Sequence, residues 1–205
     1  MAFERIGYGQ VEPNQLSAQK TGQIYASLPL DENVSVLQNG EFMYYDYATG
    51  KVTAGDGNTV GEPMLVFNEI KLYEPFWQTS YKDFAMIRVG DNYVTSRLAT
   101  AAYGENSDKQ QAATINPAHT EYGYRMDGIA PRLMKTNIGD IYTTNMVKTG
   151  TDVTYAAGDV LKLKKTDRNT LELDKDGDID TVQFVVAKVY TMPDGQAGLK
   201  LQRVK

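Results

Sequence analysis

The sequence predicts a mainly β protein, made of two small β-sandwich or barrel-like domains with an extended N-terminal arm. Short runs of β-branched and aromatic residues recur at spacings of about ten residues, which is typical of strands. Gly-Asp, Asp-Gly and Asn-Gly pairs separate these runs, and they suit tight turns because their residues tolerate positive φ. Of the 205 residues 41% are hydrophobic, and 14 tyrosines and 6 phenylalanines supply bulk for a core.

The first 30 residues, 1–30, are interpreted as the arm. Residues 8–23 are polar and rich in glutamine, and they show neither a strand period nor a helix period. Two interpretations stay open, a disordered leader or an arm that becomes ordered on a partner. In the second case Tyr25, Leu28 and Leu30 are the expected anchors.

Residues 31–135 are predicted to form the first β domain. The run 42–47 alternates between two apolar faces and ends at the hairpin loop 48–51. Another hairpin is expected around residues 90–92. Residues 97–135 lack this pattern and are interpreted as a loop-rich insertion, which in a compact domain usually carries contacts or function. The alternative is that strands go unrecognised there.

Residues 136–205 are predicted to form a second, smaller β domain. Strand-like runs recur there at spacings of about ten residues, which favours a small barrel or sandwich. The expected strands are 141–144, 159–163, 171–173, 181–190 and 199–201.

Composition excludes several classes of chemistry. The chain has no cysteine, so disulfides, thiol catalysis, zinc thiolates and iron–sulfur clusters are excluded. The net charge is −5, and the whole excess of acid precedes residue 136, so no basic face for nucleic acid is implied. No apolar run approaches the roughly 18 residues of a membrane span, and no signal peptide is visible. We therefore expect no nucleic acid and no membrane among its partners.

No familiar catalytic motif is present. His119 is the only histidine, so a Ser-His-Asp triad would depend on it, and the sequence has no Gly-x-Ser-x-Gly elbow. A glycine loop for phosphate is absent as well. Carboxylates among aromatic residues remain as the basis for two kinds of site, a glycan hydrolase that uses a pair of carboxylates or a sugar-binding surface. The acids in question are Glu41, Asp46, Glu62, Glu69 and Glu74, and the aromatics near them are Tyr45, Tyr73, Phe76 and Trp77.

Four alternating aspartates, Asp174, Asp176, Asp178 and Asp180, have the carboxylate spacing of a calcium loop. Gly177 comes two residues too early for an EF-hand, and no glutamate follows at the twelfth position. We interpret the segment as a hairpin turn, with a weak surface cation site as the alternative, and we expect no metal site elsewhere.

Tyrosine is more abundant than a core of this size requires. Its side chain joins a large apolar face to a polar tip, which favours protein–protein contacts. The predicted partner-binding residues are Tyr25, Leu28, Leu30, Trp77, Tyr122, Tyr124 and Arg125.

Several turn-and-strand stretches resemble structural proteins of tailed bacteriophages, specifically capsid decoration proteins and accessory head (head-fibre-like) proteins. These stretches are 37–53, 139–145, 155–161, 193–195 and 199–201. The resemblance implies a non-enzymatic virion part that binds the major capsid protein, other virion proteins or copies of itself, and it supplies no catalytic residues.

We therefore expect a virion structural protein that is made in the host cytoplasm, forms homo-oligomers, and uses neither cofactors nor catalytic residues. The alternative is a carbohydrate- or receptor-binding β module of a phage tail fibre or base plate, which depends on the aromatic residues near Tyr73 and Trp77.

Overall fold

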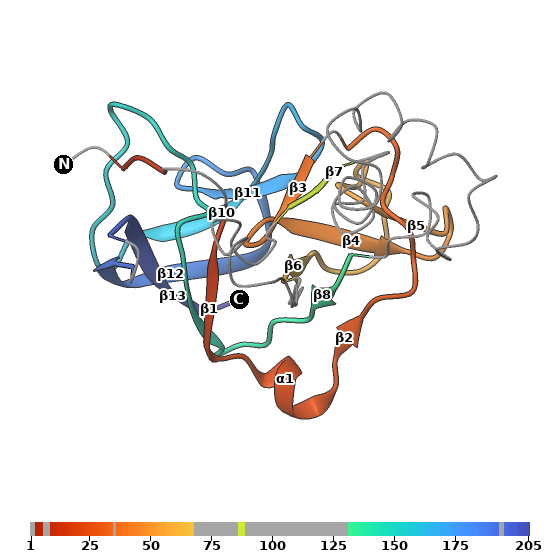
Figure 1. The fold of residues 1–205 in the computed structure, drawn as a ribbon, viewed down its shortest axis with the longest axis horizontal. Coiled ribbons are helices and arrows are strands. Elements are labelled where there is room, and N and C mark those ends of the chain that lie inside the picture. The colour runs from red at the N-terminus through yellow and green to blue at the C-terminus, as the bar shows by residue number, and fades with distance from the viewer. Residues whose placement is uncertain (1–2, 6–8, 35, 68–85, 89–130, 193–194) are drawn as a thin grey trace, which may run out of the picture.

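The computed structural model describes residues 3–5, 9–34, 36–67, 86–88, 131–192 and 195–205 (Figure 1). Within them the fold is mainly β, as the sequence predicts, and the short helix α1 spans Ser17–Thr21. The strands are β1 (Val11–Gln15), β2 (Ile24–Tyr25), β3 (Val36–Gln38), β4 (Phe42–Asp46), β5 (Lys51–Thr53), β6 (Met64–Val66), β7 (Met86–Arg88), β8 (Leu133–Met134), β9 (Ile141–Thr144), β10 (Val160–Lys165), β11 (Leu171–Asp174), β12 (Ile179–Thr191) and β13 (Ala197–Arg203).

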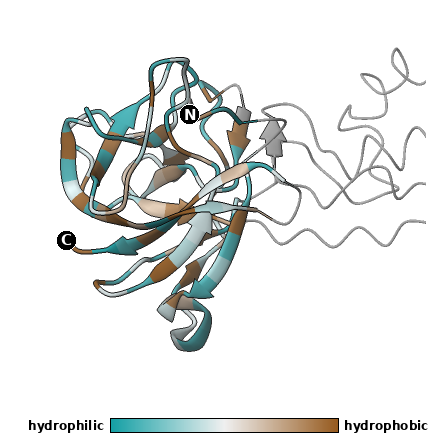
Figure 2. Ribbon diagram, turned by 90° about the vertical axis from the view of Figure 1, so that its left-hand side faces the viewer, coloured by the Kyte–Doolittle hydropathy of each residue, from teal (hydrophilic) through white to brown (hydrophobic). Residues whose placement is uncertain are grey.

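The strands follow the alternation of apolar and polar residues in the sequence. In β10, Leu161 and Leu163 are fully buried, whereas Val160 and Lys164 on the other face are exposed. Hydrophobic and hydrophilic stretches alternate in the same way along the strands of the body in Figure 2. One face of each such strand therefore packs into the core while the other meets water.

Gly40 shows why one of the predicted turns requires glycine. Its φ is +94°, which L side chains rarely adopt. A Cβ atom at this position would lie 2.5 Å from Cβ of Met146 and 2.8 Å from Oγ1 of Thr144. Both the backbone conformation and the close packing of the β3–β4 turn therefore exclude a side chain.

One 11-stranded sheet dominates the described part of the chain. Its order is β1-β9-β13-β12-β10-β11-β4-β6-β8-β2, with β5 joined to β4, and all these pairs are antiparallel. β3 and β7 form a separate two-stranded sheet. The large sheet contains strands from both predicted domains, and a domain boundary at residue 136 stays a prediction.

Residues 11–25, which belong to the predicted arm, supply both edges of this sheet. β1 pairs with β9 at one edge, and β2 pairs with β8 at the other. Farther along the predicted arm, Leu30 forms a parallel bridge with Val52 of β5.

The buried side chains form one hydrophobic cluster, to which strands from the whole sheet order contribute. At its centre Phe184 of β12 contacts two aromatic rings. Its ring centroid lies 5.4 Å from that of Phe42 and 5.6 Å from that of Tyr142. Because Phe42 and Tyr142 lie far apart in the sheet order, the sheet must curve around a shared core, in a sandwich-like or barrel-like arrangement.

Polar contacts close the curved sheet where its two edges approach each other. α1 joins the edge strands β1 and β2, and residues 135–140 join their neighbours β8 and β9. The Ser17 amide and hydroxyl donate to the carboxylate of Asp140 at 3.1 and 2.9 Å. The Asn137 side-chain amide donates to Ser17 Oγ at 2.7 Å and to Gln23 at 3.1 Å.

Arg203 of β13 completes this closure, and its side chain is 93% shielded from solvent. Its Nη1 donates to the carbonyl oxygen of Thr136, and its Nη2 donates to Glu62 at 2.5 Å. Lys135 also pairs with Glu62, at 3.3 Å. We refer to α1, residues 135–140, Arg203 and Glu62 together as the seam.

β4 and β11 meet at the middle of the sheet order, and they share one registered pair, Phe42 with Leu171. The other pairs in the large sheet have two or more registered residues each. We call this contact the β4–β11 junction. It divides the sheet into a larger half, from β1 to β11 in the sheet order, and a smaller half that contains β4, β6, β8 and β2.

Candidate interaction surface

Three tyrosines form a row that leads from the sheet to the protein surface. The ring centroids of Tyr25 and Tyr45 lie 5.3 Å apart, and those of Tyr45 and Tyr47 lie 5.1 Å apart. Tyr45 is 7% exposed, whereas Tyr47 is 75% exposed. We call Tyr25, Tyr45 and Tyr47 the aromatic row.

The base of the aromatic row is fixed by hydrogen bonds. The hydroxyl groups of Ser27 and Tyr45 lie 2.5 Å apart, and the Ser27 amide donates to Tyr45 Oη at 3.3 Å. Tyr45 and Tyr47 are two residues apart, so the strand period places them on the same face. The exposed ring of Tyr47 therefore rests on a second ring that the fold holds in place.

The predicted anchors Tyr25, Leu28 and Leu30 lie at the base of this surface. All three are half-buried and pack against the core. The backbone beside Leu30 binds β5, because Val52 donates its amide to Pro29 at 2.8 Å and accepts from Asp31 at 2.9 Å. These residues support the surface from within, and Tyr47 presents the exposed aromatic ring.

A polar hollow of about 310 Å³ lies next to the aromatic row. Asp46 lines it from the end of β4, Thr49 from the β4–β5 turn, and Asp56 and Thr59 from the following loop. Hydrogen bonds from Thr49 and Ala48 lower the pKa of Asp46, and bonds from Asn58 and Thr59 lower that of Asp56. Both carboxylates are therefore ionised at neutral pH.

Three carboxylates, Asp31, Asp46 and Asp56, and one cation line this hollow. Lys165 lines the hollow, and its Nζ donates to the carbonyl oxygen of Gly55 at 3.3 Å. Apart from these charged groups, the lining is chiefly amide, hydroxyl and backbone, with Val34 and Ala54 as its apolar members. Such a lining suits a hydroxyl-rich or cationic group more than an apolar one.

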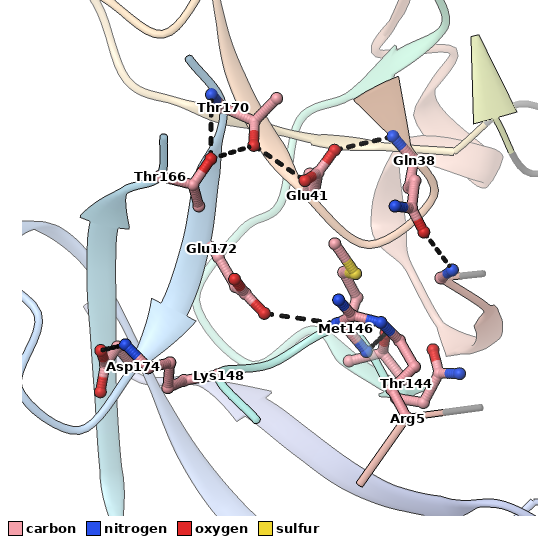
Figure 3. Close-up of polar contacts among 12 residues, drawn as sticks. Arg5, Gln38, Glu41, Thr144, Met146, Lys148, Thr166, Thr170, Glu172 and Asp174 are labelled. Atoms are coloured by element: carbon pink, nitrogen blue, oxygen red, sulfur yellow. Dashed lines mark hydrogen bonds and ion pairs between the residues drawn. The ribbon is translucent and has the colours of Figure 1, made fainter. Parts of the chain in front are cut away.

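The acids considered for carboxylate catalysis are placed differently from one another. Glu41 is fully buried: Oε2 accepts from the Gln38 amide at 2.7 Å, and Oε1 accepts from Thr170 at 2.8 Å (Figure 3). Oε1 also accepts from Arg168 at 2.5 Å. Burial raises the pKa of Glu41 to about 7, although Arg168, Gln38 and Thr170 act to lower it.

Glu62 belongs to the seam, and its pKa is shifted in the opposite direction. Its partial burial raises the pKa, but the hydrogen bonds and charges of Arg203 and Lys135 outweigh that effect and lower it overall. Glu69 and Glu74 lie outside the described residues.

The aspartate segment forms a crossover turn, which corrects the predicted hairpin. β11 ends at Asp174 and β12 begins at Ile179, but the two strands do not pair because both flank β10. Asp174 lies 3.6 Å from Nζ of Lys148, and Asp180 pairs with Lys205 at 3.1 Å. Across the part of the chain that the structure describes, no three acidic or histidine side chains are grouped so that they could hold a metal ion.

The rest of the predicted interface lies outside the described residues. This applies to Trp77, Tyr122, Tyr124 and Arg125, to His119, and to positions 97–130 of the predicted insertion. Tyr47, in contrast, is not among the predicted partner-binding residues. Its position at the end of an alternating strand, just before a hairpin loop, is the sequence signal for an exposed ring.

Comparison with protein-family models found no match, and comparisons with curated proteins and with solved structures found none either. Among the described residues, no helix has the length and apolar character needed to cross a membrane.

Proposed function

We propose that this chain is a non-enzymatic virion structural protein that attaches to a capsid lattice or to copies of itself. The observation that carries the proposal is the aromatic row, in which the 75% exposed ring of Tyr47 rests on the fixed ring of Tyr45. An aromatic side chain that is already ordered loses little conformational entropy on binding, which makes it a good interface anchor.

The proposal also draws on the resemblance of the turn-and-strand stretches to phage decoration and accessory head proteins. On a symmetric shell, many modest contacts add up to strong attachment, so no single deep site is needed. The protein would be made in the host cytoplasm and would reside in the virion.

Self-association provides the first test. Sedimentation velocity over a range of concentrations should show oligomers of the wild-type chain. Tyr47→Ala should weaken their association about tenfold, because an exposed aromatic anchor is lost, while it changes the free energy of unfolding by less than about 0.5 kcal/mol.

Val60→Ala is the matched control, because Val60 is 89% exposed and lies outside the aromatic row. It should associate as the wild type does. Antibody labelling of phage particles from the producing culture, viewed in negative stain, tests the location. A wild-type chain that stays monomeric at every concentration and labels no particles would contradict the proposal.

A second proposed function is a carbohydrate- or receptor-binding module of a tail fibre or base plate. The hollow lined by Asp46, Thr49, Asp56 and Thr59 favours it, since carboxylates and hydroxyls can bind sugar hydroxyls. A glycan array tests this function, and binding should be lost in Asp56→Ala. A glycan array without any signal would contradict this second function.

A further inference from the structure

The β4–β11 junction is the place where the large sheet is held by the fewest backbone pairs, and a buried carboxyl group lies beside it. Phe42 pairs with Leu171 across the junction. Glu41 directly precedes Phe42, and its side chain is fully buried. Glu41 is therefore positioned to influence how firmly the two halves of the sheet stay together.

Glu41 accepts hydrogen bonds from segments on both sides of the junction (Figure 3). The Gln38 amide, from the chain leading into β4, donates to Oε2 at 2.7 Å. Arg168 and Thr170, from the turn between β10 and β11, donate to Oε1 at 2.5 and 2.8 Å. Gln38 extends the network further, since its Oε1 accepts from the Gly9 amide at 2.7 Å.

The same contacts accommodate Glu41 with or without a proton. The hydroxyl oxygens of Thr166 and Thr170 lie 2.8 Å apart, and either can be the donor. When Glu41 is ionised, Thr170 donates to it. When Oε1 carries a proton, that proton can be donated to Thr170, and Thr170 then donates to Thr166.

Few charged groups face Glu41 within the described residues. Arg168 faces it from the β10–β11 turn, with a side chain that is 30% exposed and can therefore be hydrated when Glu41 is neutral. Glu172 faces it from β11 and is itself paired with Arg5 at 3.3 Å. β3 and β6, whose ends lie beside Glu41, contain no titratable side chain.

We propose that the protonation state of Glu41 controls the β4–β11 junction. Uptake of one proton by Glu41 keeps the junction closed, and loss of that proton makes its local opening easier. The physical reason is solvation. Opening returns the Glu41 side chain to water, and the ionised carboxylate gains far more from water than the neutral acid does.

The direction of the pH dependence follows from linkage. The pKa of Glu41 is about 7 in the closed junction and close to the ordinary value of 4.5 when the junction is open. The extra stability of the closed form is complete below pH 4.5, decreases as the pH rises, and is lost above about pH 7. Opening therefore becomes easier across the neutral range.

Hydrogen–deuterium exchange of the full chain between pH 5.5 and 8 tests this inference. Exchange rates are corrected for the intrinsic effect of pH and followed in peptides 36–46 and 166–174. In the wild type, the opening equilibrium constant should increase about thirtyfold over this range. A peptide covering 197–203, in β13, serves as the internal reference and should change less.

Three variants decide the outcome. Glu41→Gln keeps an acceptor but cannot ionise, so its opening should not depend on pH. Arg168→Gln removes the guanidinium that lowers the pKa of Glu41 in the closed junction, so the upper end of the rise should move to higher pH while its onset stays the same. Glu62→Gln, at the seam, should behave as the wild type does.

The same pH dependence in wild type and Glu41→Gln would overturn the proposal, and so would a flat wild-type profile. If Glu41→Gln does not fold, Arg168→Gln decides alone, because its side chain is partly exposed. An unshifted profile in that variant overturns the proposal.

Discussion

The β4–β11 junction and the seam join the same two halves of the sheet, but they use opposite electrostatics. At the junction, burial of Glu41 outweighs its cationic partner and raises its pKa to about 7. At the seam the cation is the buried member, because Arg203 is 93% shielded while the Glu62 side chain is 32% exposed. Two cations then lower the pKa of Glu62. Which member of an ion pair is buried thus decides the direction of the shift.

The largest predicted difference between the two regions is steric. Gly40 at the junction and Gly139 at the seam have the same φ, +94°, but only Gly40 is tightly packed, since nothing lies within 4 Å of a Cβ at Gly139. We expect Gly40→Ala to lower the free energy of unfolding by about 3–4 kcal/mol and Gly139→Ala by about 1–2 kcal/mol. Urea denaturation measures both. Equal losses would mean that packing at the junction adds nothing to the backbone strain.

The next largest effect is expected at the seam. Arg203→Ala removes the donors to Thr136 and Glu62 and leaves the buried Thr136 carbonyl without the Arg203 hydrogen bond. This should lower the free energy of unfolding by about 3 kcal/mol. The loss should be similar at pH 5.5 and pH 8, because Glu62 stays ionised over that range. A loss that differs strongly between the two pH values would remove the distinction between the two regions.

The smallest effect concerns Glu62 itself. Because its pKa is lowered, its contribution to stability is present above the ordinary value of 4.5 and is lost as the pH falls below that value. Glu62→Gln should therefore lower the free energy of unfolding by less than about 1 kcal/mol at pH 7, since the side chain is a third exposed and screened, and by less at pH 3 than at pH 7. Thermal unfolding at the two pH values checks this. A cost that grows on acidification would contradict the assignment.

The sequence predicts the strands that carry their own local signal. The run 171–173 appears as β11, 141–144 as β9, and 181–190 within β12. The alternation of Tyr45 and Tyr47 also predicts the face on which their rings meet. Hydrophobic period and turn residues are local properties, so these elements can be recognised without knowledge of the fold.

The edge strands β1 and β2 lack such a signal. They lie in a polar segment, and their partners β9 and β8 follow more than a hundred residues later, so pairing at long range creates them. The burial of Glu41 cannot be recognised in the sequence for the same reason, because it depends on long-range contacts. Arg168 lies 127 residues away in the sequence, and no motif links the two positions.

The nature of the two edges limits how copies of this chain can meet. Pro13 lies in the middle of β1, where it has no N–H to donate, and the register of β1 is irregular between Glu12 and Gln15. β2 is two residues long. Such edges are poor templates for an added strand, so crowding many molecules together should not lead to amyloid-like growth through these edges.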